Sequence, residues 1–166
     1  MSVLAKAGGV LAGVAVVGYL AGPKTGATGE GCAVPGYRPD QMANAAAIVS
    51  VGRDMGVPEQ GRVIAVATAM QESGLRNLNY GDRDSLGLFQ QRPSMGWGSA
   101  AQVMTPAYSA RKFYERLRTV PDWERMSVTA AAQAVQRSGF PNAYARHEKA
   151  ARSLVGAVEG AGCTKS

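Results

Sequence analysis

Residues 61–73, with the sequence GRVIAVATAMQES, form the stretch that most strongly decides the fold. The stretch follows Pro58, which is tolerated in the first turn of a helix, and it runs into Gly74, a common helix stop. Its apolar residues recur with the spacing of one helix face, at Val63, Val66, Ala67 and Met70. The sequence therefore predicts a helix from Pro58 to Gly74 with a buried stripe.

Helical patterning also lies on both sides of this stretch. Before it, Asp40 is a good N-cap for a helix that continues to about Met55 and stops at Gly56. After it, helices are predicted over Pro106–Arg118, from Ser127 or Thr129 to Ser138, and from Pro141 to about Gly160. The apolar stripe expected for the first of these three comprises Ala107, Ala110, Phe113, Tyr114 and Leu117.

The length of the chain, 166 residues, suits one compact domain, and no internal repeat is visible. Hydrophobic residues make up 46% and aromatic residues 7%, as suits a small helical fold. We expect an all-α domain over residues 40–163, with room for a very small β-hairpin around Tyr80–Asp84. The net charge of +6 is compatible with nucleic acid, with anionic cell-wall polymers or with simple solubility. Because no basic stripe interleaved with aromatics is present, nucleic acid is not an expected partner.

The N-terminus has the pattern of an export segment. The uncharged stretch Ala7–Gly22 follows Lys6 and is bounded by Pro23 and Lys24. We expect residues 1–22 to form an apolar leader helix that serves as a signal peptide or a signal anchor, and residues 23–39 to form a Gly/Pro linker. The uncharged stretch Ala7–Gly22 is shorter than the roughly 20 residues of a firm membrane span. A glycine-rich helix packed in a larger secretion, conjugation or phage assembly is the alternative. The protein is expected outside the cytoplasm.

Two cysteines, Cys32 and Cys163, lie near the two edges of the predicted domain. An exported protein would oxidise them, so a disulfide between them is predicted. They do not form a metal site, because no CxxC pair exists and His147 is the only histidine. No cofactor is expected. His147 itself is predicted to face solvent.

The segment 74–98 lacks regular patterning, and loops of this length inside a compact domain are usually functional or disordered. Its apolar residues, Leu78, Leu86, Leu88, Phe89 and Trp97, argue against disorder. Glu72 lies beside this loop at the end of a helix. The helix dipole and the apolar neighbourhood would both raise its pKa, as a glycosidic general acid requires. An exposed helix-end glutamate is the alternative interpretation.

The pairing of Glu72-Ser73 with Gly87-Leu88-Phe89-Gln90 resembles the lytic transglycosylase and goose-type lysozyme superfamily. The resemblance extends over about Asp40–Gly160 and implies a lysozyme-like fold. It also implies that peptidoglycan glycan strands are the substrate, with cleavage of the MurNAc–GlcNAc β-1,4 bond. By this resemblance Glu72 is the catalytic acid and base, Ser73 helps to orient it, and Gln90 contacts the sugar. Ser85, in the same loop, is a further candidate for substrate binding.

The chain departs from the family at a later helix. The family often has an Ala-Tyr-Asn-Ala-Gly motif whose tyrosine supports the glutamate. The counterpart here is residues 134–139, with Val135 in place of the tyrosine. Gln136 is therefore a candidate hydrogen-bonding group in the cleft. Tyr144 is a candidate for the missing hydroxyl, with helix packing as the alternative.

A second carboxylate would distinguish two chemistries. Asp82 or Asp84 would serve a water-activating hydrolase, although a plain turn explains both residues equally well. Without that carboxylate, the C6 hydroxyl of the muramic acid attacks its own anomeric carbon and leaves a 1,6-anhydro end. Three functions stay open: a lytic transglycosylase, a non-catalytic glycan-binding or assembly protein, and a lysozyme-type hydrolase. Trp97 is a candidate sugar platform or a plug over the core, and Trp123 is predicted in the core.

Overall fold

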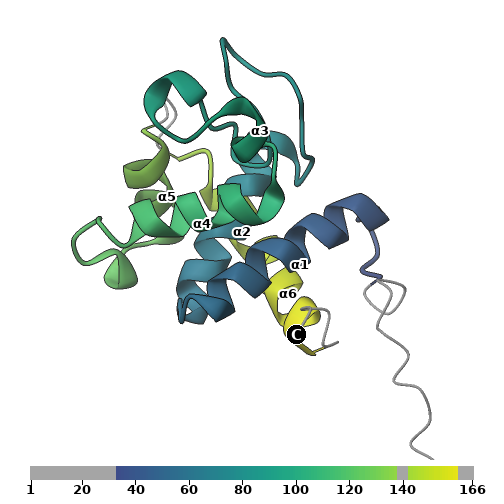
Figure 1. Cartoon of the computed structure of the whole chain (residues 1–166). Coiled ribbons are helices and arrows are strands. Elements are labelled where there is room, and N and C mark those ends of the chain that lie inside the picture. Colours follow the sequence, from purple (N-terminus) through teal and green to yellow (C-terminus); the bar gives the residue numbers. More distant parts are fainter. Residues whose placement is uncertain (1–32, 138–141, 161–166) are drawn as a thin grey trace, which may run out of the picture.

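The computed structural model describes residues 33–137 and 142–160. The predicted leader, most of the linker and the predicted Cys32–Cys163 disulfide lie outside these residues. The described helices are α1 (Pro39–Asp54), α2 (Glu59–Ser73), α3 (Ala100–Val103), α4 (Pro106–Leu117), α5 (Val128–Gln136) and α6 (Glu148–Gly160), with 3₁₀ turns η2 (Pro93–Met95), η3 (Trp123–Arg125) and η4 (Ala145–His147). Figure 1 shows their arrangement.

The described part of the chain is all-α, as predicted. Between residues 33 and 160, leaving out the gap at 138–141, extended pairing is limited to two isolated antiparallel bridges, Leu78–Gly87 and Leu86–Gln91. The first bridge encloses Tyr80–Asp84, where a very small hairpin was expected, but it does not extend into a ladder. None of the helices in the described ranges combines the length and the apolar character needed to cross a membrane.

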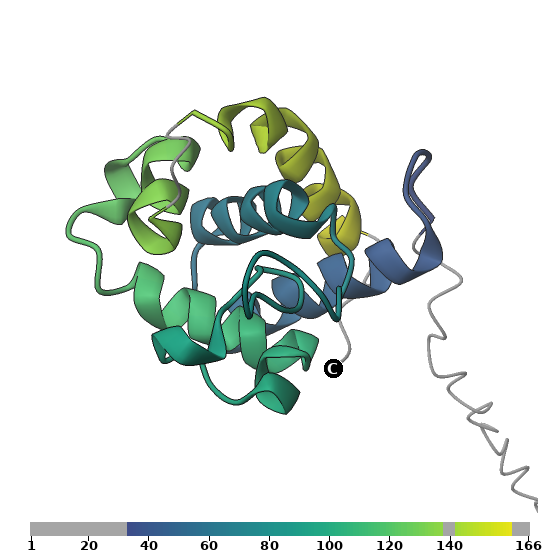
Figure 2. The same ribbon diagram turned by 90° about the horizontal axis from the view of Figure 1, so that it is seen from above.

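Helix α2 lies at the centre of the domain. It packs against α1, α4, α5 and α6, which surround it in the view of Figure 2. The predicted stripe of Val63, Val66, Ala67 and Met70 is buried, but so are all the other residues from 63 to 70. A helix whose middle is buried on every side lies in the interior of a fold, and Thr68, the one polar residue in this stretch, bonds the carbonyl of Ile64. The single-stripe prediction was therefore too narrow.

The helix caps follow the sequence with small shifts. α1 begins at Pro39 with Arg38 as its N-cap, and Asp40 lies in the first turn, where it forms an ion pair with Arg38 at 2.8 Å. The prediction of Asp40 as N-cap was wrong by two residues. At α5, Ser127 is the N-cap, and its hydroxyl accepts a hydrogen bond from the Ala130 amide at 3.3 Å.

Helix α5 ends earlier than predicted because Arg137 takes a left-handed conformation, with φ of 53°. The last helix begins at Glu148 rather than at Pro141. Residues 142–147 form a turn and η4 instead, and the side chain of Tyr144, in that turn, is completely buried. In α4, the predicted stripe is buried except for Ala107, which is exposed, and Ser109 takes its place in the interior.

Candidate active site

The carboxyl of Glu72 lies in the last turn of α2 and is half-buried. The hydroxyl of Tyr144 donates a hydrogen bond to Glu72 Oε1 at 2.7 Å. Tyr144 is fully buried, so its ring has no freedom to turn away into solvent. The turn before η4 thus brings the Tyr144 hydroxyl to the Glu72 carboxyl. Tyr144 was the residue named from the sequence as a candidate for this hydroxyl.

Gln136 is the second polar group at Glu72. Its side-chain amide hydrogen-bonds the Glu72 carboxylate. The same side chain donates from Nε2 to the carbonyl of Phe89 at 2.8 Å. Gln136 is the last residue of α5, so one amide links the end of that helix both to the carboxyl and to the loop that carries the Gly-Leu-Phe-Gln motif.

The ionisation of Glu72 is set by two opposing effects. Burial removes water from the carboxylate and raises the pKa of Glu72 above its ordinary value. The hydrogen bonds from Tyr144 and Gln136 favour the charged form and act in the opposite direction, but the effect of burial is larger. The direction agrees with the one expected from the sequence. Such a carboxyl holds its proton to higher pH and can then donate it.

Ser73 fixes the loop rather than the carboxyl. Its hydroxyl lies 2.7 Å from the carbonyl of Leu88 and 3.1 Å from the carbonyl of Ala69 in its own helix. The same oxygen accepts a hydrogen bond from the Arg76 amide at 3.2 Å. Because a hydroxyl has one proton, the shorter contact to Leu88 is the main donated bond. Ser73 thereby joins the end of α2 to the motif fifteen residues later.

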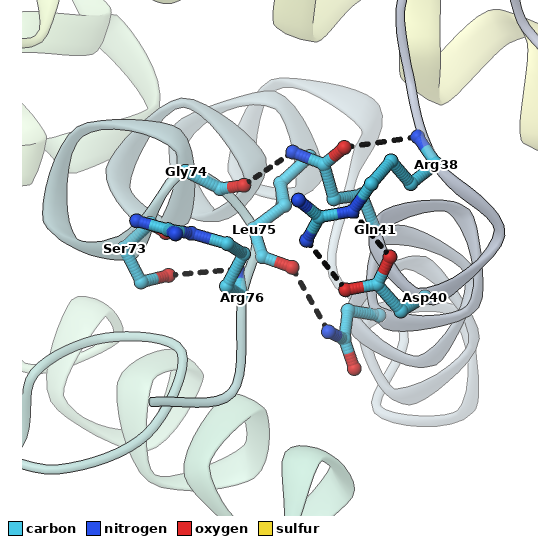
Figure 3. A network of polar contacts seen from close by, with 8 residues as sticks. Arg38, Asp40, Gln41, Ser73, Gly74, Leu75 and Arg76 are labelled. Carbon is cyan, nitrogen blue, oxygen red and sulfur yellow. Dashed lines mark hydrogen bonds and ion pairs between the residues drawn. The ribbon is translucent and has the colours of Figure 1, made fainter. Parts of the chain in front are cut away.

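The first turns of α1 hold the chain that leaves α2, as Figure 3 shows. Gly74 turns the chain in a left-handed conformation, with φ of 63°. Gln41 Nε2 donates to the carbonyl of Gly74 at 2.8 Å, and Asn44 Nδ2 donates to the carbonyl of Leu75 at 2.9 Å. The Gly74 carbonyl is one that the helix end leaves unpaired, and the two bonds together hold the chain that leaves α2 against α1.

Gln90 and Ser85 lie within the loop itself. Gln90 Nε2 donates to the carbonyls of Tyr80 and Gly87 at 3.3 and 3.2 Å. The side chain of Gln90 packs so closely over Gly81 that a Cβ there would lie 2.0 Å from Gln90 Oε1. Ser85 is buried, at 7% exposure. In the described residues, the hydrogen-bonding groups that reach Glu72 are Tyr144 and Gln136, and neither Gln90 nor Ser85 joins them.

The two aspartates of the loop differ in their surroundings. Asp84 accepts hydrogen bonds from Arg92 Nε at 2.6 Å and from the Ser94 amide at 2.8 Å. The Ser94 amide and Arg92 hold the pKa of Asp84 far below its usual range. Asp82 has a side chain that is 88% exposed. Asp84 therefore closes the loop from 84 to 94, as a turn-forming aspartate does, while Asp82 lies in solvent.

The tryptophans and His147 complete the neighbourhood. Trp97 is buried, with the Arg116 guanidinium 3.6 Å from its ring centre, and it covers the core instead of standing free as a sugar platform. Trp123 is buried, as predicted. His147 is half-buried, and its Nε2 lies 3.1 Å from Gln71 Oε1, so the expectation of a solvent-facing histidine was wrong. Gln71 carries no signal in the sequence that would have singled it out.

Among the residues that the structure describes, no group of three or more histidine, cysteine, aspartate or glutamate side chains is arranged to hold a metal ion. Comparison of the chain with protein-family models gave no match, and comparison with curated proteins gave no match either.

Proposed function

We propose that this chain is a peptidoglycan lytic transglycosylase with a lysozyme-like fold, and that it cleaves the β-1,4 bond between MurNAc and GlcNAc with Glu72 as acid and base. The observation that carries the proposal is the half-buried Glu72 carboxyl, whose pKa is raised by burial and whose Oε1 accepts a hydrogen bond from Tyr144. The neighbouring loop, tied on through Ser73 and Gln136, carries the motif that resembles the family.

The chemistry follows from one carboxyl acting twice. Because Glu72 Oε1 accepts a hydrogen bond from the Tyr144 hydroxyl, Oε2 is the oxygen that carries the acid proton. Glu72 gives that proton to the glycosidic oxygen as the bond from the muramic C1 to this oxygen breaks. The muramic C6 oxygen then bonds to C1, and the Glu72 carboxylate takes the C6 hydroxyl proton. The products are a free GlcNAc hydroxyl and a 1,6-anhydro end, and Glu72 is protonated again.

Tyr144 and Gln136 suit the stage of this cycle at which Glu72 is ionised. Both donate hydrogen bonds to the carboxylate, which is the form of Glu72 present after the first proton transfer. Fixed donors that meet charge as it develops need no reorganisation at that moment. Burial favours the protonated form before the transfer, and the two donors support the ionised form after it.

A lysozyme-type hydrolase is the second candidate function and the other enzyme among the three candidates. It requires a carboxylate to activate water. The contacts of Asp84 with Arg92 and Ser94 favour a structural role for that residue, and Asp82 offers only an exposed side chain. These observations favour the transglycosylase route. A glycan-binding or assembly protein without activity is the third candidate.

The partner we propose is the glycan strand of peptidoglycan, met outside the cytoplasm. Residues 1–22 would export the domain or anchor it in the membrane, alone or within a larger secretion, conjugation or phage assembly. Gln90, Gln136, Tyr144, Ser73 and Ser85 remain the proposed surroundings of the bound sugar. Ser73 bonds the carbonyl of Leu88, and Ser85 is buried within the loop, so both would act by shaping the loop.

The experiment that separates the three candidates is digestion of purified sacculi with the full chain, followed by mass spectrometry of the soluble products. Muropeptides with 1,6-anhydro ends support the transglycosylase. Products with reducing ends instead support the hydrolase. Sedimentation of the protein with sacculi without any release would leave only the binding protein.

A further inference from the structure

The last turn of α2 is held by a second set of contacts beside the Tyr144 bond. Arg146 Nη2 donates to Gln71 Oε1 at 2.8 Å, and Arg146 Nε donates to His147 Nε2 at 3.1 Å. His147 Nε2 lies 3.1 Å from the same oxygen of Gln71. Three polar side chains therefore meet next to Glu72, and two of them follow closely after Tyr144 in the chain.

These contacts reach α2 at a different place from the Tyr144 hydroxyl. Successive residues of an α-helix point about 100° apart, so Gln71 and Glu72 leave the helix in different directions. The hydroxyl contact with Glu72 fixes one point of the turn that contains the buried Tyr144. The contact of Arg146 with Gln71 fixes a second point, and two fixed points prevent the turn from rotating about either one.

We propose that Gln71, Arg146 and His147 form a clamp that sets the Tyr144 hydroxyl on the Glu72 carboxyl, and that Gln71 is a positioning residue for this acid–base group. The inference rests on the proposed function for its meaning in catalysis. The geometry that it predicts does not require a substrate, so the clamp can be tested separately from glycan cleavage.

The protonation of His147 suits the clamp. Burial and the charge of Arg146 both lower the pKa of His147, which keeps the imidazole neutral near neutral pH. A neutral ring with its proton on Nδ1 leaves Nε2 free to accept a hydrogen bond from Arg146 Nε. In this tautomer His147 Nε2 and Gln71 Oε1, 3.1 Å apart, are both acceptors, and the Arg146 guanidinium bridges them. Arg146 then donates to His147 and to Gln71 at the same time.

The clamp has a measurable consequence at Glu72. Among the described residues, the groups that hydrogen-bond its carboxyl are Tyr144, from the turn before η4, and Gln136, from the end of α5, and both lower its pKa. If the turn loosens, the hydrogen bond from Tyr144 to Glu72 weakens. The effect of burial, which raises the pKa of Glu72, is then opposed less. The pKa of Glu72 should then move further upward.

The test is a pH titration of the Glu72 side-chain carboxyl by ¹³C NMR in the full chain, with no substrate present. Gln71→Ala and Arg146→Ala should each shift the pKa of Glu72 upward, in the same direction as Tyr144→Phe. The double variant Gln71→Ala/Tyr144→Phe should give the pKa of Tyr144→Phe alone, because the clamp acts only through the hydroxyl. Arg146→Ala leaves the sequence of α2 intact if Gln71→Ala weakens folding. Because it also removes a positive charge, only the part of its shift that disappears in Arg146→Ala/Tyr144→Phe counts for the clamp.

The chain offers a matched control at the other end of α2. Arg152 of α6 donates from Nη2 to Gln60 Oε1 at 2.9 Å, which is the same kind of contact far from the carboxyl. Gln60→Ala should leave the pKa of Glu72 unchanged. A wild-type pKa in both Gln71→Ala and Arg146→Ala would overturn the clamp. A Gln71→Ala shift that adds in full to that of Tyr144→Phe would also overturn it.

The kinetic readout ties the clamp to catalysis. Because Glu72 must be protonated to act as an acid, a higher pKa moves the alkaline limb of the activity profile to higher pH. Gln71→Ala should show this displacement and a lower kcat with KM unchanged. If the titration shows coupling while the wild-type chain releases no products, the clamp stands and the proposed function fails.

Discussion

Glu72 is stabilised in its neutral form by burial and in its charged form by two hydrogen-bond donors. The balance favours the neutral form, so the folded protein binds this proton more tightly than the unfolded chain does. By linkage, the stability contributed by the protonated carboxyl is complete below the unfolded-state pKa and is lost as the pH rises through the folded-state pKa. A carboxyl held in this way lowers stability at neutral pH.

The direction in which stability changes with pH gives a first prediction. Glu72→Gln should raise the Tm at about pH 7–8, where the wild type carries a half-buried charge, and the gain should disappear at about pH 4, below the ordinary pKa of a glutamate carboxyl. Glutamine is neutral and keeps an oxygen that can accept the hydrogen bond from the Tyr144 hydroxyl. Thermal melts at several pH values measure the effect. Glu59→Gln, an exposed change in the first turn of the same helix, is the control. A Tm gain in Glu72→Gln that persists at acid pH would contradict the assignment.

Ser73 carries the second prediction. Ser73→Ala removes the hydroxyl that bonds the carbonyl of Leu88 and leaves that carbonyl buried without its donor. The free energy of unfolding should fall by about 1–3 kcal/mol. Urea denaturation measures the loss, and the exposed Ser153→Ala should change stability by less than about 0.5 kcal/mol. Equal stability of the two variants would show that Ser73 does not fasten the loop.

At the scale of elements, the sequence predicted the long helices well because their signals are local. The stops at Gly56 and Gly74 and the cap at Ser127 act within one turn of chain. Helix α3 was missed, although Ser99 and Gln102 form a capping box there. The pair Ser-x-x-Gln was the available signal.

The errors have a common cause in tertiary contacts. The start of α6 shifted from Pro141 to Glu148 because Tyr144 turns inward to the end of α2. At the site, Glu72, Gln136 and Tyr144 could be named from the sequence and its family resemblance. The contact of Gln71 with Arg146 joins segments 75 residues apart, which no local pattern encodes. The hydrogen bond from Gln90 to the carbonyl of Tyr80 lies within one irregular loop, where no helix or strand periodicity predicts it.

The loop between α2 and α3 carries the third prediction. Asp84→Asn weakens the bond with Arg92, so amide hydrogen exchange at Ser94 should become faster. Sacculus cleavage should fall far less than the about 10²–10⁴-fold expected for a catalytic carboxylate, and the products should keep their anhydro ends. The exposed Asp82→Asn should change neither property. Complete loss of cleavage in either variant would support the hydrolase.

At the scale of the whole molecule, Cys32 and Cys163 both lie outside the residues that the structure describes. The disulfide between Cys32 and Cys163 stays a prediction from the sequence. If the bond forms, reduction should lower the free energy of unfolding by up to about 4–5 kcal/mol, the chain-entropy value for a loop of this length. Denaturation of oxidised and reduced protein, with thiol counting under denaturing conditions, tests it. Two free thiols in the air-oxidised protein would end this prediction.

We propose that one carboxyl, Glu72, does the chemistry of the whole domain. The most direct measurement compares release of muropeptides from sacculi by the wild type, Glu72→Gln and Glu59→Gln, with binding to sacculi followed in parallel. Glu72→Gln keeps the size of the side chain but has no proton to transfer, so release should fall by about 10²–10⁴-fold while binding is retained. Glu59→Gln should cleave like the wild type. Release by Glu72→Gln at the wild-type rate would contradict the account.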